Sequence, residues 1–168
     1  MRLVLMRHCR ATTRGPYADA DRPLLHAGEE QAEWTGRALA RMGVPPDVVL
    51  ASPLRRCRQT AEIAAGVLGL PPNSLHIVEA LAPGASPQRM VDAFAVHADR
   101  DAVLVVGHAP DLEGLAGFLL AGKTEAQLRL LPGGCACLAL DRSGGLDVLE
   151  WWLLPEQLKL IAQAPASE

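Results

Sequence analysis

Four short apolar runs, separated by segments of helical length, constrain the fold of this 168-residue chain more than any other feature. The runs are residues 3–6, 48–51, 75–78 and 102–106, of which the third contains one polar residue, His76. Short runs rich in Leu, Val and Ile are typical of strands buried on both faces. Apolar residues with helical spacing fill the intervals, at about 27–42, 53–68 and 87–98. This alternation predicts a mainly parallel sheet with right-handed crossovers and helices packed against it.

The pattern changes after Pro132-Gly133-Gly134. Residues 135–140 and 146–153 read as two strands joined by Ser143-Gly144-Gly145, which predicts an antiparallel hairpin. The chain is 49% apolar and has no linker long enough to divide it, so residues 1–168 are expected to form a single domain. The expected fold class is α/β, a three-layer sandwich whose mainly parallel sheet is flanked by helices and ends in the hairpin.

Charge and composition exclude several classes of protein. The net charge of −3 gives no basic field that would favour nucleic acid, and no apolar run is long enough to span a bilayer. The first strand begins directly after Met1, which leaves no room for a signal peptide, so a cytoplasmic location is expected. Cys9, Cys57, Cys135 and Cys137 form no C-x-x-C pair and are expected to be free thiols.

Polar residues follow several of the predicted strands directly. Arg7 and His8 come after the first strand, Glu79 after the third and His108 after the fourth. Because the carboxyl ends of parallel strands meet at one edge of a sheet, these side chains are expected to share a crevice.

The helix after the second strand has an unusual beginning. Ser52 and Pro53 suit the N-cap and the first helical position. Arg55, Arg56 and Arg58 then fall in the first turn, where the helix dipole favours acidic residues. Either these arginines form a solvated basic patch, or a bound anion supplies the missing negative charge.

Two histidines, several arginines and a helix amino terminus suit a tetrahedral dianion. Arginine forks and backbone N–H groups bind its oxygens, and a histidine among them can attack phosphorus and hold it as a covalent phosphohistidine. No metal or cofactor is expected, since the sequence lacks G-x-x-x-x-G-K-[ST], G-x-G-x-x-G and H-E-x-x-H motifs and a carboxylate-rich cluster. No G-x-S-x-G elbow supports a serine hydrolase.

With these residues the chain resembles the histidine phosphatase superfamily of phosphoglycerate mutase-like fold, and most closely its small SixA-type phosphohistidine phosphatases. Four motifs carry the resemblance, in family order over nearly the whole chain. They are Leu5-Met6-Arg7-His8, Arg22-Pro23-Leu24 with Gly28, Ser52-Pro53-Leu54-Arg55-Arg56-Cys57-Arg58-Gln59-Thr60-Ala61, and Val106-Gly107-His108-Ala109-Pro110 with Leu112-Glu113.

The resemblance implies a role for each matching residue. His8 is the expected nucleophile, Arg7 and Arg56 are expected to grip the phosphoryl group, and His108 is the second histidine of the pocket. Three further residues are expected at the substrate: Arg22, Arg55 and Ser52. Glu79 is a candidate proton donor, and Glu113 is expected to brace a pocket residue. Gln59 and Thr60 are interpreted as helix-packing positions.

One position departs from the family pattern. Cys9 stands where the family has glycine, which adds bulk and a potentially redox-sensitive thiol beside the nucleophile. The other pocket groups are present, so activity is expected to persist.

The expected reaction is metal-independent hydrolysis of phosphohistidine in a signalling protein, such as a histidine-phosphotransfer domain. The chain lacks the inserted segments that cover the pocket in larger family members, and Ala109 stands where the acid-phosphatase branch has aspartate. A weak general acid hampers an alkoxide leaving group more than an imidazole. Two alternatives stay open: a phosphomonoesterase for a small phosphate ester, and a catalytically silent phosphoprotein-binding module.

Overall fold

The computed structural model describes residues 1–13, 15–125, 127–141, 143 and 145–165 and contains a six-stranded sheet. The strands are β1 (Arg2–Arg7), β2 (Val48–Ala51), β3 (Leu75–Ile77), β4 (Ala102–Gly107), β5 (Cys135–Ala139) and β6 (Val148–Leu153). Their order across the sheet is β3-β2-β4-β1-β5-β6. β1, β2, β3 and β4 are mutually parallel, whereas β5 is antiparallel to both β1 and β6. The predicted parallel sheet and the terminal hairpin are therefore confirmed.

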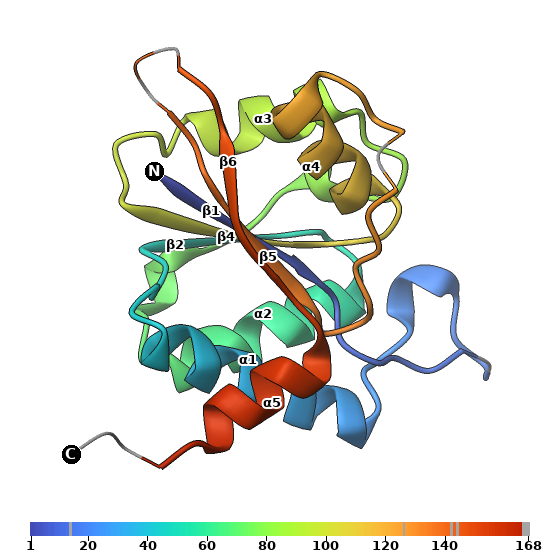
Figure 1. Ribbon diagram of the computed structural model, residues 1–168. Coiled ribbons are helices and arrows are strands. Elements are labelled where there is room, and N and C mark those ends of the chain that lie inside the picture. Colours follow the sequence, from blue (N-terminus) through green and yellow to red (C-terminus); the bar gives the residue numbers. More distant parts are fainter. Residues whose placement is uncertain (14, 126, 142, 144, 166–168) are drawn as a thin grey trace.

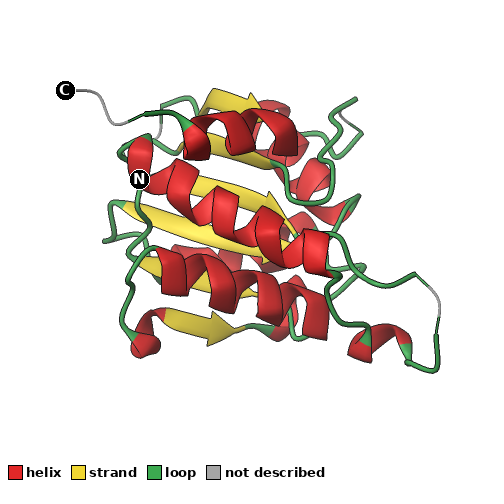
Figure 2. Ribbon diagram, turned by 90° about the horizontal axis from the view of Figure 1, so that it is seen from below, coloured by secondary structure: helices red, strands yellow, loops and turns green. Residues whose placement is uncertain are grey.

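Helices cover both faces of the sheet, which gives three layers (Figures 1 and 2). The helices are α1 (His26–Arg41), α2 (Arg55–Val67), α3 (Pro87–Ala95), α4 (Asp111–Ala121) and α5 (Pro155–Gln163). α1, α2 and α5 lie together on one face, and α3 and α4 lie on the other. In the described part of the chain no helix is both long and apolar enough to cross a membrane.

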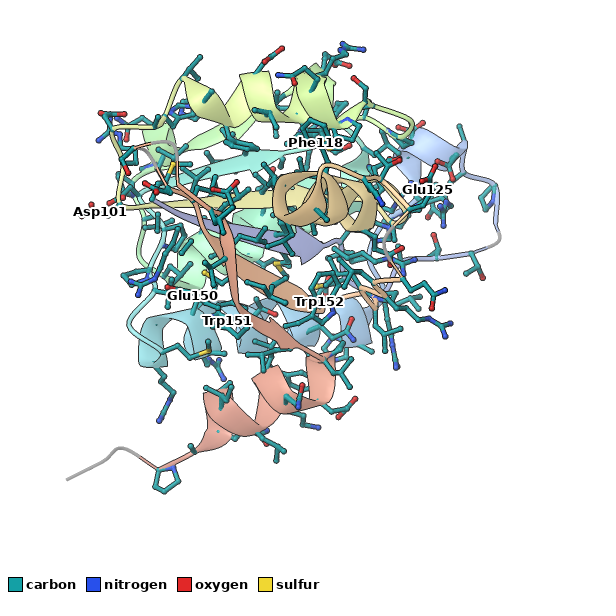
Figure 3. All side chains as sticks on the ribbon, turned by 45° about the horizontal axis from the view of Figure 1, so that its top comes forward. Asp101, Phe118, Glu125, Glu150, Trp151 and Trp152 are labelled. Atoms are coloured by element: carbon teal, nitrogen blue, oxygen red, sulfur yellow. The ribbon has the colours of Figure 1, made fainter. Side chains whose placement is uncertain are left out.

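The central strand β1 serves both layers because its side chains alternate between faces. Val4 and Met6 are fully buried beneath α1, α2 and α5, while Leu3 and Leu5 are fully buried beneath α3 and α4. The two tryptophans of β6 continue this alternation (Figure 3). Trp151 packs against the core residues beneath α1, α2 and α5, and Trp152 packs against those beneath α3 and α4. A strand buried on both faces holds its carboxyl end in a fixed position, and Arg7 and His8 follow there.

Two helix boundaries differ from those expected. α3 begins as predicted, with Ser86 accepting a hydrogen bond from the Arg89 N–H, but it ends at Ala95. α2 begins at Arg55 and has Leu54 as its N-cap, with no side-chain cap. The prediction of Ser52 as the N-cap is therefore wrong. The hydroxyl of Ser52 is engaged with a histidine instead, as described below.

Candidate active site

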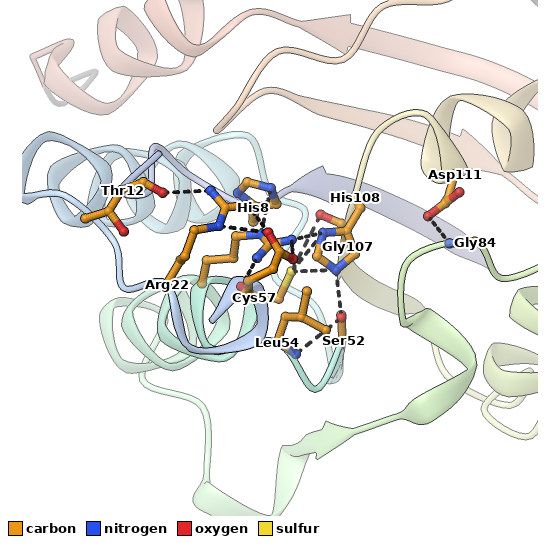
Figure 4. A network of polar contacts seen from close by, with 12 residues as sticks. His8, Thr12, Arg22, Ser52, Leu54, Cys57, Gly84, Gly107, His108 and Asp111 are labelled. Carbon is orange, nitrogen blue, oxygen red and sulfur yellow. Dashed lines mark hydrogen bonds and ion pairs between the residues drawn. The ribbon is translucent and has the colours of Figure 1, made fainter. Parts of the chain in front are cut away.

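A cavity of about 500 Å³ opens at the carboxyl ends of β1 and β4. Its lining consists of Arg7, His8, Asp19, Arg22, Arg56, Pro83, Gly84, His108, Ala109, Pro110 and Asp111. The structure thus brings together all four residues predicted to be catalytic, His8, Arg7, Arg56 and His108, and also Arg22. Figure 4 shows His8, Arg22 and His108 converging from different segments of the chain.

His8 is held in one tautomer. Its Nδ1–H donates to the carbonyl oxygen of Cys9 over 2.8 Å, which leaves the lone pair on Nε2. Nε2 accepts from Nε of Arg56 over 3.3 Å and therefore lies among the arginines of the cavity. Burial lowers the pKa of His8 to about 4, and the nearby arginines add to this effect. At neutral pH the ring is consequently uncharged, with a nucleophilic nitrogen directed into the cavity.

Arg56 is a buried cation in the first turn of α2. Besides His8, it donates from one terminal nitrogen to the backbone oxygen of Asp19 over 2.8 Å. The other terminal nitrogen lies 3.3 Å from an Asp19 carboxylate oxygen and 3.5 Å from Nδ1 of His108. Arg56 therefore contacts both histidines at once, as a group that grips a phosphoryl oxygen would need to do.

Arg7 is braced from the opposite side. One terminal nitrogen donates to the carbonyl oxygen of Leu130 over 2.9 Å, and the N–H of Leu130 donates to Glu113 over 2.7 Å. Glu113 thereby fixes the peptide that holds Arg7. Nε of Arg7 is buried and has no hydrogen-bond partner among the described residues. This buried N–H of a cavity residue is therefore a donor that can bind an anion in the cavity.

His108 is fixed from behind by Ser52. Nε2 of His108 lies 2.8 Å from the Ser52 hydroxyl, and Ser52 is fully buried (Figure 4). Because Arg56 can only donate, its contact makes Nδ1 of His108 an acceptor and places the ring proton on Nε2. Burial, then the neighbouring His8, lowers the pKa of His108 to about 3. Ser52 does not line the cavity, so its contact orients His108 and replaces the expected substrate contact.

A loop that we call the strap, residues 10–13 and 15–25, covers one side of the cavity. It projects beyond the carboxyl end of β1 as the blue loop of Figure 1. A bridge between Ala11 and Leu24 closes its base. Gln31 accepts from the Arg10 N–H over 3.0 Å, and Gln59 accepts from the Leu24 N–H over 2.9 Å. The strap is thereby attached to α1 and α2.

Two motif residues owe their identity to close packing around the strap and the nucleophile. A Cβ at Gly28 would overlap the backbone oxygen of Arg10, so only glycine lets α1 approach the strap this closely. Thr60 accepts from the Cys9 N–H over 3.1 Å and so fixes the peptide next to His8. Gln59 and Thr60, interpreted from the sequence as packing positions, thus hold backbone groups at the site. The signal available in the sequence was the spacing of Thr60 from Cys57 and Ala64, which puts this polar residue on the apolar face of the helix.

Asp19 is a cavity residue that the sequence did not indicate. One carboxylate oxygen accepts from Nε of Arg22 over 2.9 Å and lies 2.7 Å from a terminal nitrogen of that arginine. The other lies 3.3 Å from Arg56. The hydrogen bond from Arg22 and the charge of Arg56 lower the pKa of Asp19, so its carboxylate is ionised at neutral pH.

Besides Ser52, the cavity leaves out two predicted site residues, Arg55 and Glu79. Arg55 is exposed and faces a neighbouring cavity of about 370 Å³, together with Arg58. Glu79 is exposed, begins a short 3₁₀ turn and is not part of the lining, so the structure does not bring it to the histidines. Asp111, at the start of α4, lies in the lining and accepts from the Gly84 N–H over 3.0 Å. It is a carboxylate that sequence reasoning missed.

Cys9 adopts an ordinary backbone conformation, since no described residue other than glycine has a positive φ. Its side chain is fully buried in the core under α1 and α2 and does not occupy the cavity. Burial raises the pKa of its thiol to about 12, so the reactive thiolate is scarce at neutral pH. The expected redox-sensitive thiol beside the nucleophile finds no support in this environment, and the side chain is a packing group.

Replacing Cys9 with glycine is therefore expected to destabilise the protein while leaving turnover within a few-fold. Loss of a fully buried side chain and added backbone freedom should together cost about 2 kcal/mol. Urea unfolding measures the first effect and steady-state phosphate release the second. An increase of orders of magnitude in turnover would mean that Cys9 obstructs the site.

The two histidines predict a characteristic dependence on pH. Histidines in an unfolded chain take up a proton near pH 6.5, whereas His8 and His108 do so only near pH 4 and pH 3 when folded. Between these limits the unfolded state binds more protons, so the free energy of unfolding should fall as pH decreases from about 6.5 towards 4. NMR of the imidazole rings checks the cause, and a His8 signal that titrates above pH 6 would contradict it.

Another cavity, of about 560 Å³, lies at the opposite end of the sheet, at the amino ends of β1 and β4. Its arginine, Arg2, is already paired with Glu150 over 2.9 Å. No histidine belongs to its lining. The convergence of arginines and histidines therefore identifies the cavity of about 500 Å³, lined by His8 and His108, as the candidate active site.

Comparison with known proteins gives an independent result. Residues 3–82 match the family model of the histidine phosphatase superfamily (branch 1). An uncharacterized protein of Picosynechococcus sp. is 39% identical over an alignment of 156 positions that covers 88% of each chain. The structure of the protein histidine phosphatase SixA complexed with tungstate superposes with a TM-score of 0.82 at 27% identity, covering 95% of this chain and 100% of that one.

A more distant structure shares the fold. The α-ribazole phosphatase of Shigella flexneri superposes with a TM-score of 0.74 at 21% identity, covering 92% of this chain and 97% of the other.

Proposed function

The chain belongs to the histidine phosphatase superfamily and is a phosphatase, and from this premise we propose that it hydrolyses phosphohistidine in a protein through a covalent intermediate on His8. The observation that carries the proposal is the orientation of His8. Its ring is neutral, its Nδ1–H is held by the Cys9 carbonyl, and its Nε2 faces Arg56 in the cavity. That is the arrangement a nitrogen nucleophile needs beside a gripped phosphoryl group.

In the first step, Nε2 of His8 forms a bond to phosphorus as the P–N bond of the substrate breaks. The electron pair stays on the departing imidazole. A phosphohistidine that is protonated on its other ring nitrogen leaves as neutral imidazole and needs no proton from the enzyme. Arg7, Arg22 and Arg56 line the cavity and would neutralise the equatorial oxygens, while Nδ1 of His108 could share a proton with one of them.

In the second step, water attacks the phosphoryl group on His8, and the P–N bond to Nε2 breaks. The electron pair returns to His8, whose Nδ1–H has remained on the Cys9 carbonyl, and the water proton passes to a phosphate oxygen or to solvent. Inorganic phosphate is released. His8 thus leaves as a neutral imidazole in the same way as the substrate ring did.

The carboxylates around the cavity support an imidazole leaving group over an alkoxide. An alkoxide needs a strong proton donor, and Asp19 is held ionised by arginines while Glu79 lies outside the lining, which leaves Asp111 as the other carboxylate of the lining. The similarity to SixA over the whole chain points the same way. We propose a phosphorylated protein as the partner, for which a histidine-phosphotransfer domain is the first candidate, and residues 1–168 as one catalytic domain.

A comparison of substrates tests the proposal. Phosphate release is measured from a phosphorylated histidine-phosphotransfer domain and from a panel of phosphate monoesters, with a metal chelator present throughout. We expect kcat/KM for phosphohistidine to exceed that for any ester by about a hundredfold or more. Efficient turnover of one small ester would overturn the substrate assignment and leave the phosphatase chemistry in place.

Asp111 favours a second candidate, hydrolysis of a small phosphate ester. Its carboxylate lies in the cavity lining three residues after His108, where it could protonate an alkoxide. The variant Asp111→Asn separates the two candidates. Loss of ester hydrolysis with phosphohistidine hydrolysis intact would assign Asp111 to ester chemistry alone.

A further inference from the structure

In the described structure, without bound substrate, Asp19 supplies the anion that the arginines of the cavity require. Its carboxylate contacts Nε and a terminal nitrogen of Arg22 and also reaches Arg56. These contacts resemble those that two oxygens of a phosphate would make with a pair of arginines. The strap therefore places an internal carboxylate among the groups expected to hold substrate and product.

This carboxylate can leave without releasing either arginine. Arg56 stays held by the backbone oxygen of Asp19 over 2.8 Å, and Arg22 donates from its other terminal nitrogen to the backbone oxygen of Thr12 over 2.7 Å (Figure 4). The Asp19 side chain is 66% exposed, whereas that of Arg56 is 5% exposed. Rotation of the Asp19 side chain into solvent thus frees the anion positions and leaves the cations in place.

We infer that Asp19 is an affinity-determining residue that competes with the phosphoryl group and with product phosphate for Arg22 and Arg56. The carboxylate weakens both noncovalent complexes, whereas a phosphoryl group already bonded to His8 is retained in spite of it. The contact therefore weakens product binding and favours release of phosphate. The inference rests on the proposed function only in that phosphate is the product, and it holds for phosphohistidine and ester substrates alike.

Titration calorimetry with inorganic phosphate tests the inference without any turnover. Wild type is compared with Asp19→Asn, which removes the charge, and with Asp19→Glu, which keeps it. We expect Asp19→Asn to bind phosphate about tenfold more tightly, since two ion pairs that oppose binding are lost. Asp19→Glu should stay closer to wild type.

Asp21→Asn is the matched control. Asp21 belongs to the same 3₁₀ turn and is exposed, and it forms no ion pair with either arginine in the described part of the chain. The Asp21→Asn protein should bind phosphate with the affinity of wild type. A difference between the two variants then reports the contacts of Asp19 and not the loss of one negative charge.

Three outcomes would overturn the inference. Unchanged or weaker phosphate binding by Asp19→Asn would mean that the carboxylate braces the arginines. Absence of detectable phosphate binding in wild type and in Asp19→Asn would show that the carboxylate and phosphate do not compete. A gain in affinity that persists when Arg56→Ala is added would place the anion elsewhere. Failure of the proposed substrate would appear separately, in the substrate comparison, and would leave the phosphate affinities untouched.

Discussion

Replacing His8 with alanine is expected to lower kcat at least about a thousandfold, because the variant lacks the atom that receives the phosphoryl group. The side chain lies at the end of a strand buried on both faces, and its hydrogen bond to the Cys9 carbonyl fixes its orientation. His108 also directs an accepting nitrogen, Nδ1, at Arg56, over 3.5 Å, while Ser52 holds its Nε2. The two histidines are therefore distinguished by trapping the phosphorylated residue.

The measurement is phosphate release together with trapping of the intermediate. Wild type is mixed with labelled substrate and quenched in alkali, where phosphohistidine survives, and the labelled peptide should contain His8. His26→Ala is the control, because His26 is an exposed histidine at the start of α1 and does not belong to the cavity lining. Label on His108, or His8→Ala turnover within tenfold of wild type, would refute the assignment of the nucleophile.

Replacing Arg56 with alanine is expected to lower kcat/KM about a hundredfold to a thousandfold. Arg56 contacts His8, His108 and the strap simultaneously, so its loss removes a charge from the transition state and an orienting contact from the nucleophile. Arg56→Lys should recover only part of the loss, because a single ammonium cannot reproduce the planar fork.

Steady-state kinetics with the preferred substrate measures this effect, and circular dichroism checks that each variant is folded. Arg89→Ala serves as the control, since Arg89 is an exposed helical arginine on α3. Arg55→Ala should cost far less than Arg56→Ala, because Arg55 points to the neighbouring cavity. A loss below tenfold for Arg56→Ala would mean that the other arginines suffice.

The sequence predicted the sheet well because residues 3–6 of β1 and all of β2 and β4 are free of polar side chains. Strands buried on both faces have this composition, and few other structures do. It also predicted that His8, Arg7, Arg56 and His108 lie in one cavity. Each follows within a few residues of the carboxyl end of a strand, and parallel strands place these ends at the same edge of the sheet.

Ser52 shows where such reasoning stopped. Local rules made Ser-Pro a helix start, but the hydroxyl binds a histidine 56 residues away, and the helix begins three residues later. Tertiary contact overrode local preference. Asp19 was missed for a related reason, because the path of an irregular loop is not encoded in periodicity. Asp111 lies in the first turn of α4, where an acidic residue is expected for the helix dipole alone and so drew no attention. The exposed position of Glu79 was equally beyond the reach of sequence spacing.

The strap divides the site into a part that is hard to change and a part that is easy to change. Its base is attached to Gln31 and Gln59 of two packed helices, whereas residues 15–21 are exposed. Substitutions in β1 or α2 alter the core and the chemistry together, so selection has little freedom there. Apart from Asp19, which contacts Arg22 and Arg56, substitutions at the tip of the strap alter mainly the surface that meets an incoming molecule. The choice of phosphorylated substrate can therefore change through a few surface positions while the residues of the cavity stay the same.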